Sequence, residues 1–173
     1  ILKREDVRDS FISRKYSSIA ELPLGSVVGT SSLRRKAQLL NKRNDLKVVE
    51  FRGNVQKRLE KLDNNVAVAT FLATAGLNRL GLKELINPIS TDEMLPAVAQ
   101  GAVGIEHLRS EKIEALLAPL SDSESKKRVM AERAFLRELD GSCRTLIGGL
   151  AQKNNEELKF MGEIISADGQ EKI

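Results

Sequence analysis

Two short segments of this chain carry arginines directly after an apolar run rich in β-branched residues. The first is Gly29–Arg35 (GTSSLRR), and the second is Phe51–Asn54 (FRGN), with Arg58 one helical turn further on. A strand that delivers its end to a helix start leaves backbone N–H groups unpaired and exposes the positive end of the helix dipole. Hydroxyl and guanidinium groups at such a point bind carboxylates or phosphates. The pattern predicts two anion-binding turns, which adjacent strands would bring together to hold a ligand with several negative groups.

Alternating strand and helix patterns position these turns. The expected elements are a strand at 26–28, a helix from Ser31 or Ser32 to about Arg43, a strand at 47–51, a helix capped by Asn54, a strand at 66–72 and a short helix at 73–81. The run at 66–72 is almost continuously apolar, which is typical of a strand covered on both faces. Successive units of this kind predict a doubly wound α/β domain, whose ligands bind beyond the C-terminal strand ends.

The pattern changes after Pro88. Leu95–Ala102 combines a proline with small residues, as a crossing between lobes would. The elements expected beyond it are a strand at 103–105, helices at 110–117 and 123–139, and antiparallel strands at 145–152 and 157–166. Asp168-Gly169 is a strong hairpin-turn motif. This tail is predicted to be a separate, smaller α+β module.

The basic residues gather in the half of the chain that contains the two turns. Residues 1–60 hold 14 Lys and Arg against 7 Asp and Glu, whereas residues 61–173 hold 14 against 17. A basic half favours a polyanionic partner, and nucleic acid is one. However, the chain has no Trp, one Tyr and five Phe, too few for a platform on which bases stack. A solvated basic face remains the open alternative.

Composition and cysteine content narrow the class of protein. The 173 residues are 41% hydrophobic and 30% charged, which suits a soluble globular protein. No apolar run approaches the ~20 residues that a membrane span needs, and no signal-peptide pattern is present. The single cysteine, Cys143, cannot form an internal disulfide, so we expect a cytoplasmic protein. Because the sequence begins at Ile1 within charged, strand-like residues, we expect the chain to be a fragment of a longer one.

Several long motifs in one order give the sequence a family resemblance. They are Arg4–Asp9 (REDVRD), Val28–Arg35 (VGTSSLRR), Arg52–Val55 (RGNV) with Arg58-Leu59, Ala75–Leu80 (AGLNRL), Leu95–Ala102 (LPAVAQGA) and Gly141–Cys143 (GSC) before Ile147-Gly148. The sequence resembles the porphobilinogen deaminases, also called hydroxymethylbilane synthases, from end to end. The resemblance implies three domains, the first two built like the lobes of a periplasmic binding protein. Residues 1–5 would end domain 1, 6–95 form domain 2, 96–120 cross and return to domain 1, and 121–173 belong to an incomplete domain 3.

The resemblance also gives Cys143 a role. From the residues alone, a buried and inert thiol is the more common interpretation, since free cysteine packs like a small hydrophobic residue. In the family this cysteine carries a covalent dipyrromethane cofactor through a thioether, to which four porphobilinogen molecules are added with loss of ammonia before the linear tetrapyrrole is released by hydrolysis. Each pyrrole carries an acetate and a propionate, and desolvated carboxylates need charged partners.

The arginine turns supply such partners, according to the same resemblance. The residues implied to bind the cofactor carboxylates are Thr30, Ser32, Arg34, Arg35 and Gly53. Arg52, Arg58 and Arg79 are implied to contact the substrate and the growing chain. A surface ion pair is the alternative for each of these three arginines.

The family's catalytic aspartate lies in the upstream domain, so we assign that role to none of Asp6, Asp9 and Asp63 and expect this chain alone to be inactive. Detection of hydroxymethylbilane from the purified 173-residue chain would contradict this expectation. We expect a cytoplasmic monomer that binds no metal, nucleic acid or membrane, and we expect His107 to be a surface residue. Departures from the family pattern are Val68, Ala99, Ser142 and Leu146. A non-catalytic α/β module that binds polyanions, or a basic nucleic-acid binder, remains the alternative function.

Overall fold

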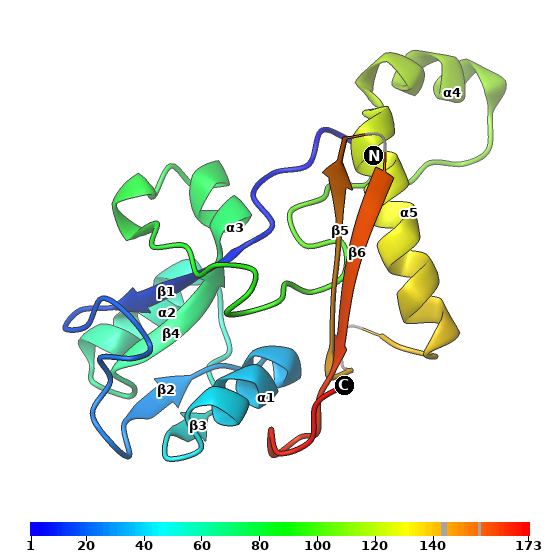
Figure 1. Cartoon of the computed structure of the whole chain (residues 1–173). Coiled ribbons are helices and arrows are strands. Elements are labelled where there is room, and N and C mark those ends of the chain that lie inside the picture. Colours follow the sequence, from blue (N-terminus) through cyan, green and yellow to red (C-terminus); the bar gives the residue numbers. More distant parts are fainter. Residues whose placement is uncertain (143–144, 156) are drawn as a thin grey trace.

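The computed structural model describes residues 1–142, 145–155 and 157–173. Its helices and strands form two units, an α/β unit in the first half of the chain and a smaller α+β unit at the end (Figure 1). The extended first residues and an irregular crossing segment run between them. These two stretches lie side by side, since the N–H groups of Leu2 and Glu5 donate to the carbonyls of Val103 and Gly101. The mixed α/β architecture confirms the predicted fold class at this coarse level.

A four-stranded sheet forms the centre of the α/β unit, in the order β1-β4-β2-β3. The strands are β1 (Asp9–Ser13), β2 (Val27–Gly29), β3 (Lys47–Val49) and β4 (Ala69–Ala73). Strand β2 is parallel to β3 and β4, whereas β1 is antiparallel to β4, with Asp9 opposite Ala73. The C-terminal ends of the three parallel strands and the start of β1 therefore meet at one edge of the sheet.

Helices cover both faces of this sheet. They are α1 (Leu33–Lys42), α2 (Val55–Asp63) and α3 (Thr74–Arg79), followed by a single 3-10 turn, η1 (Lys83–Leu85). The chain steps from β2 outward to β3 and then back past β2 to β4. Right-handed crossovers therefore place α1 and α2 on opposite faces, which is the winding predicted from the sequence.

The core is divided by the sheet into two clusters. Phe11 and Phe71 pack with Leu39 of α1, whereas their neighbours Ile12 and Leu72 pack in a second cluster with helix α2. Successive residues of a strand point to opposite faces, so one strand supplies both clusters. This confirms burial on both sides for residues 69–72 of the predicted run, whereas Val66 is 49% exposed and β4 itself begins only at Ala69.

Local capping sets where the helices begin. The Ser32 side chain accepts a hydrogen bond from the Arg35 N–H at the start of α1, and the Asn54 side chain accepts one from the Lys57 N–H at the start of α2. Polar side chains at this position satisfy N–H groups that the helix leaves unpaired. Both predicted caps are confirmed, and α1 ends with Arg43 as its C-cap residue.

The α+β unit consists of a helix packed on a hairpin. Its elements are α5 (Ser123–Glu138), β5 (Ile147–Asn154) and β6 (Glu157–Ile164), with β5 and β6 antiparallel as predicted. After β6 the chain turns back at Asp168-Gly169, where Gly169 has a φ of 75°. This turn touches the α/β unit, because the Asn41 side-chain amide of α1 donates to the Gly169 carbonyl at 2.7 Å.

The segment between the two units contains α4 (Glu111–Leu117) and a short 3-10 turn, η2 (Ala118–Leu120). The strand predicted at 103–105 is wrong, since these residues belong to no sheet. Val103 accepts one hydrogen bond from Leu2, and a single backbone bond does not make a ladder. Among the helices of the described ranges, none combines the length and the apolar character that a bilayer crossing requires.

The crossing contains a strained residue at Ala99, which has a φ of 61°. This left-handed conformation disfavours residues with a Cβ, whereas glycine adopts it freely. We expect Ala99→Gly to raise the free energy of unfolding by about 1 kcal/mol. Ala97→Gly, two residues away at a position without positive φ, should lower it instead. Urea unfolding of the two full-length variants checks this prediction, and an equal loss of stability in both would contradict it.

Candidate functional site

The two arginine-bearing turns lie against each other where β2 and β3 end. The Thr30 N–H donates to the Val49 carbonyl at 3.0 Å, and the Phe51 N–H donates to the Ser31 Oγ at 2.9 Å. The predicted meeting of the two turns is therefore confirmed. It follows from the parallel register of β2 and β3, in which Gly29 lies opposite Val49.

Two glycines permit this close arrangement. A Cβ at Gly29 would lie 2.4 Å from the Phe51 ring, so only glycine lets that fully buried ring pack over the end of β2. Gly53 has a φ of 126°, a conformation that L-residues rarely adopt. Its carbonyl accepts a hydrogen bond from the Arg58 Nε at 2.9 Å, which ties the start of α2 to the turn.

Arg34 and Arg35 share one buried carboxylate, that of Asp9. The Arg34 Nη2 lies 2.7 Å from Asp9 Oδ2, and the Arg35 Nη2 lies 2.6 Å from Asp9 Oδ1. Asp9 is completely buried, and the two arginines are 4% and 9% exposed. The Gln100 side-chain amide of the crossing also donates to Asp9 Oδ1, at 3.0 Å. Two guanidiniums thus face a single carboxylate, which leaves positive charge for a ligand to neutralise.

Burial acts against the charged form of each partner in this cluster. It would raise the pKa of Asp9, but the charges of Arg35 and Arg34 outweigh burial and hold that pKa below its usual range. Burial lowers the pKa of Arg34, while Asp9 and, more weakly, Glu163 oppose the shift. Arginine nevertheless stays protonated, because its ordinary pKa lies far above neutrality.

Within this cluster, Arg34 keeps a hydrogen-bond donor that none of the described residues accepts. Its Nη1 donates to the Leu95 carbonyl at 2.6 Å, but its buried Nε has no hydrogen-bond partner among the described residues. A buried donor without a partner costs about 1–3 kcal/mol. Such a group marks a place where a further acceptor would stabilise the protein.

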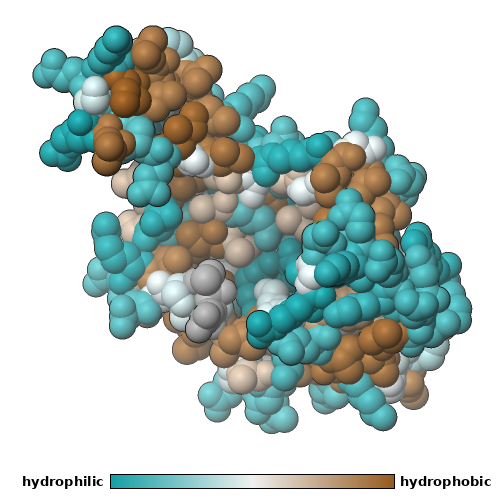
Figure 2. Space-filling model, turned by 180° about the vertical axis from the view of Figure 1, so that it is seen from behind, coloured by the Kyte–Doolittle hydropathy of each residue, from teal (hydrophilic) through white to brown (hydrophobic). Residues whose placement is uncertain are grey.

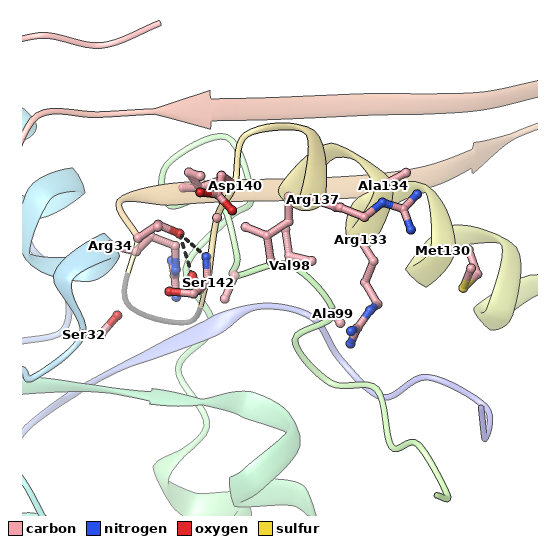
Figure 3. Close-up of a pocket in the computed structure, with 15 residues that line it drawn as sticks. Ser32, Arg34, Val98, Ala99, Met130, Arg133, Ala134, Arg137, Asp140 and Ser142 are labelled. Atoms are coloured by element: carbon pink, nitrogen blue, oxygen red, sulfur yellow. Dashed lines mark hydrogen bonds between the residues drawn. The ribbon is translucent and has the colours of Figure 1, made fainter.

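A cavity of about 610 Å³ opens beside Arg34. It lies between the start of α1, the crossing, helix α5 and the loop that follows α5 (Figure 3). The residues that line it are Ser32, Arg34, Ala97, Val98, Ala99, Met130, Arg133, Ala134, Leu136, Arg137, Asp140, Gly141, Ser142, Thr145 and Ile147. Among the described residues, the lining carries three arginines and one aspartate, with apolar side chains between them. Seen from the opposite side, the molecule is hollowed between its two units, with hydrophilic residues in the hollow (Figure 2).

Of the predicted site residues that the structure describes, two line this cavity, namely Ser32 and Arg34. Thr30 and Arg35 are buried behind them, and Arg35 donates to the Phe71 carbonyl at 3.1 Å. Arg58 is half-buried, and burial followed by the nearby charge of Arg35 lowers its pKa. Arg35 and Arg58 are therefore close enough to interact, which links the two turns electrostatically.

The two remaining arginines lie on the surface. Arg52 pairs with Glu50 at 2.6 Å, and both side chains are largely exposed. Arg79, at the end of α3, is exposed and donates to the Gly101 carbonyl of the crossing at 3.4 Å. An exposed ion pair of this kind contributes ~0–1 kcal/mol to stability, so Arg52 is free to exchange Glu50 for another carboxylate at little cost.

Cys143, the predicted attachment point, lies outside the described residues. Ser142 and Thr145, the described residues that flank positions 143–144 in the sequence, both line the cavity. The Thr145 Oγ1 accepts from the Ser142 N–H at 3.1 Å and donates to the Ser142 carbonyl at 2.6 Å. These two bonds join Ser142 and Thr145 to each other.

Sequence reasoning missed a buried carboxylate, Glu132 of α5. Its oxygens accept from Arg4 at 2.6 and 2.9 Å, from the Ala99 N–H at 2.7 Å and from the Ala151 N–H at 2.9 Å. The Glu132 side chain is completely buried, and the Arg4 side chain is almost completely buried. Both charges look like ordinary surface residues in the sequence, and only the fold brings these four chain segments together.

The molecule belongs to the class of two-unit proteins with a cavity between the units. Its α/β unit has buried arginines at the strand ends and is joined to an α+β unit across an arginine-lined cavity. Two family models match this chain. One, described as the porphobilinogen deaminase, dipyromethane cofactor binding domain, covers residues 1–115, and one for the porphobilinogen deaminase C-terminal domain covers 126–173. The chain belongs to the porphobilinogen deaminase family.

Curated relatives agree with these matches. The porphobilinogen deaminase of Paracoccus denitrificans is 57% identical over 174 residues, which cover 99% of this chain and 56% of that protein. The porphobilinogen deaminases of Nitrobacter hamburgensis and Nitrobacter winogradskyi are 54% and 52% identical, over 97% and 98% of this chain and 54% of each relative. The chain thus spans about half the length of the curated relatives it matches.

Proposed function

We propose that the full-length protein containing this chain is a hydroxymethylbilane synthase. It would join four porphobilinogen molecules to a dipyrromethane held on Cys143, with loss of one ammonia each, and then release the linear tetrapyrrole by hydrolysis. The observation that carries the proposal is the cavity that Arg34 lines together with Ser142 and Thr145. Family membership supports the same reaction.

The residues present fit a pyrrole cofactor with acidic side chains. The cavity volume of about 610 Å³ falls within the ~300–1,000 Å³ of typical small-molecule sites. Its lining combines apolar walls with three arginines, and the unpartnered Arg34 Nε offers a donor to a carboxylate. When bound, the dipyrromethane supplies the terminal pyrrole carbon to which the first substrate is joined.

In this proposal, one group of residues binds the carboxylates of the cofactor, and another binds those of the substrate and the growing chain. Thr30, Ser32, Arg34, Arg35 and Gly53 hold the cofactor. The burial of Thr30, Arg34 and Arg35 fits a group that is installed once and stays in place. A charge-assisted hydrogen bond in such a place contributes about 1.5–3 kcal/mol, which offsets the desolvation of a carboxylate.

Arg52, Arg58 and Arg79 contact the substrate and the growing chain. Two of them, Arg52 and Arg79, are exposed at the edge of the sheet and can therefore exchange their present contacts for those of a moving ligand. Guanidinium suits this task because its planar fork binds a carboxylate through two parallel hydrogen bonds.

The proposed domain organisation follows the family. Residues 1–5 end the first domain, 6–95 form a second domain like a lobe of a periplasmic binding protein, 96–120 cross and return to the first, and 121–173 begin the third. Apolar side chains gather on the projecting part of the molecule around α4 (Figure 2). Leu108 and Leu116, 86% and 68% exposed, are the largest contributors. This surface is suited to packing against a further part of the protein, which we propose acts as a cytoplasmic monomer.

The intact mass of the purified full-length protein tests the function. We expect a mass increase that matches a dipyrromethane on Cys143, and its loss in the Cys143→Ser variant, because a thioether needs the sulfur. Addition of porphobilinogen should then raise the mass in steps of one pyrrole unit. A non-catalytic module that binds polyanions would show the unmodified mass throughout, and that result would overturn the proposal.

A further inference from the structure

The hairpin of β5 and β6 is packed on both of its faces (Figure 1). On one face, a Cβ at Gly149 or at its partner Gly162 would lie 3.5 or 2.6 Å, respectively, from the Phe135 ring of α5. On the other face, a Cβ at Gly148 would lie 3.1 Å from the side-chain amide of Gln38 in α1. Successive residues of a strand point to opposite faces, so the hairpin separates α5 from α1.

The residue of β6 that is buried is a charged one. Within residues 157–164, all of which the structure describes, Glu163 is buried whereas the others range from partly to largely exposed. Glu163 lies opposite Gly148 in the antiparallel register, so its side chain projects from the face of the hairpin that meets α1. Burial of a carboxylate is costly unless a partner compensates for the lost water.

Lys172 is the ion-pair partner of Glu163, and the pairing is incomplete. Lys172 Nζ lies 2.5 Å from Glu163 Oε2, but the Lys172 side chain is 47% exposed and therefore partly screened by solvent. The other oxygen, Oε1, is buried with no hydrogen-bond partner among the described residues. The Nε of Arg34 in the α/β unit is buried without a partner in the same way. Each unit thus leaves one atom of a buried charged group unsatisfied.

Arg34 and Glu163 adjoin the same contact between the two units. The Arg34 Nη1 and the Gln38 Nε2 both donate to the Leu95 carbonyl, at 2.6 and 3.0 Å. The amide of Gln38 and the side chain of Leu95 would also each lie 3.1 Å from a Cβ at Gly148. The charge of Glu163 accordingly reaches Arg34, since burial lowers the pKa of Arg34 and Glu163 is one of the carboxylates that oppose this shift.

We propose that Glu163 is a positioning residue that supplies a second counter-charge to the buried arginine pair and thereby weakens the binding of a carboxylate at Arg34. The inference rests on the proposed function, in which Arg34 holds a cofactor carboxylate. Arg34 and Arg35 carry two positive charges against the single negative charge of Asp9. Glu163 offsets part of the remaining charge from the other unit. An incoming carboxylate is therefore attracted less strongly, because charges interact over longer distances in the poorly screening interior.

Lys172 determines how strongly Glu163 acts on the arginine. While the two are paired, Lys172 neutralises part of the carboxylate charge, and without Lys172 the full charge would act on Arg34. Removing either member of this one ion pair should therefore change carboxylate binding in opposite directions. An ion pair that only held the end of the hairpin in place would give the same change for both removals.

Porphobilinogen binding to the full-length Cys143→Ser protein tests this inference. A dissociation constant is measured there without turnover, because a thioether to the cofactor needs the sulfur. In this background we expect Glu163→Gln to bind porphobilinogen about fivefold more tightly and Lys172→Gln to bind it about twofold more weakly, the scale of one partly screened charge. Glu157→Gln removes a charge from the exposed far end of β6 and should leave the dissociation constant unchanged. Cooperative urea unfolding verifies that each variant is folded.

The directions of these changes decide the result. Equal changes in the Glu163 and Lys172 variants, or no change in either, would overturn the proposal. Lys172→Gln alters an exposed side chain and is decisive by itself, since tighter or unchanged binding contradicts the proposal. A difference between the two variants that persists in an Arg34→Leu background would place their effect elsewhere and would also overturn it. Failure of the proposed function is seen separately, as absence of cofactor mass on Cys143 in the unsubstituted protein.

Discussion

Replacement of Glu132 by alanine is expected to lower the free energy of unfolding by about 3–5 kcal/mol, because it leaves the buried Arg4 guanidinium without its counter-ion. The Arg4 side chain is 1% exposed, and Glu132 receives four hydrogen bonds from three other stretches of chain. The N–H groups of Ala99 and Ala151 would also lose their acceptor. A fall in the urea midpoint of the full-length variant measures the effect.

The matched control is Glu138→Ala on the same helix. Glu138 is exposed, so its removal should change the free energy of unfolding by no more than ~0.5 kcal/mol. If Glu132→Ala and Glu138→Ala have equal effects, the buried carboxylate does not join the segments in the way described.

Asp9→Asn is expected to have the second largest effect, about 3 kcal/mol or more, since it leaves Arg34 and Arg35 buried with no negative charge between them. Asparagine has nearly the same shape, so packing is preserved and the loss reports on charge. Asp63→Asn, which breaks the exposed pair with Arg14, should cost less than ~1 kcal/mol and serves as the control.

The pH dependence of the Asp9 variant distinguishes charge from packing. The pKa of Asp9 is lowered in the folded protein, so its stabilisation is fully present above the ordinary value of ~3.9 and is lost as the pH falls through the lowered folded value. The difference between the native protein and Asp9→Asn should therefore be complete at neutral pH and shrink below about pH 4. A difference that stays constant into strong acid would point to packing instead.

Features that depend on neighbouring residues could be predicted from the sequence. Ser32 and Asn54 cap their helices because the cap is made within one turn. The Asp168-Gly169 turn was predictable for the same reason, since Gly169 needs only its own positive φ. The extended stretch at 103–105 was predicted wrongly as a strand, because local β-propensity cannot show that the neighbouring chain supplies only one bond.

The candidate site likewise has features that could be predicted from the sequence and features that could not. The arginine turns could be predicted, because parallel strands bring their C-terminal ends to one edge. The role of Asp9 as their common partner could not, since it requires β1 to run antiparallel beside β4, which is a long-range pairing. The spacing of Arg133 and Arg137 was visible in the sequence, but only the fold shows that their face of α5 borders the cavity.

The four hydrogen bonds at Glu132 also limit how the cavity can grow. They fasten α5 to the Ala99 backbone and to β5 at once, so the helix and the crossing cannot separate without exposing a buried charge. Extra room for a longer ligand must then come from other walls of the cavity. Under the proposed function, the growing pyrrole chain is therefore accommodated while α5 and the crossing stay joined.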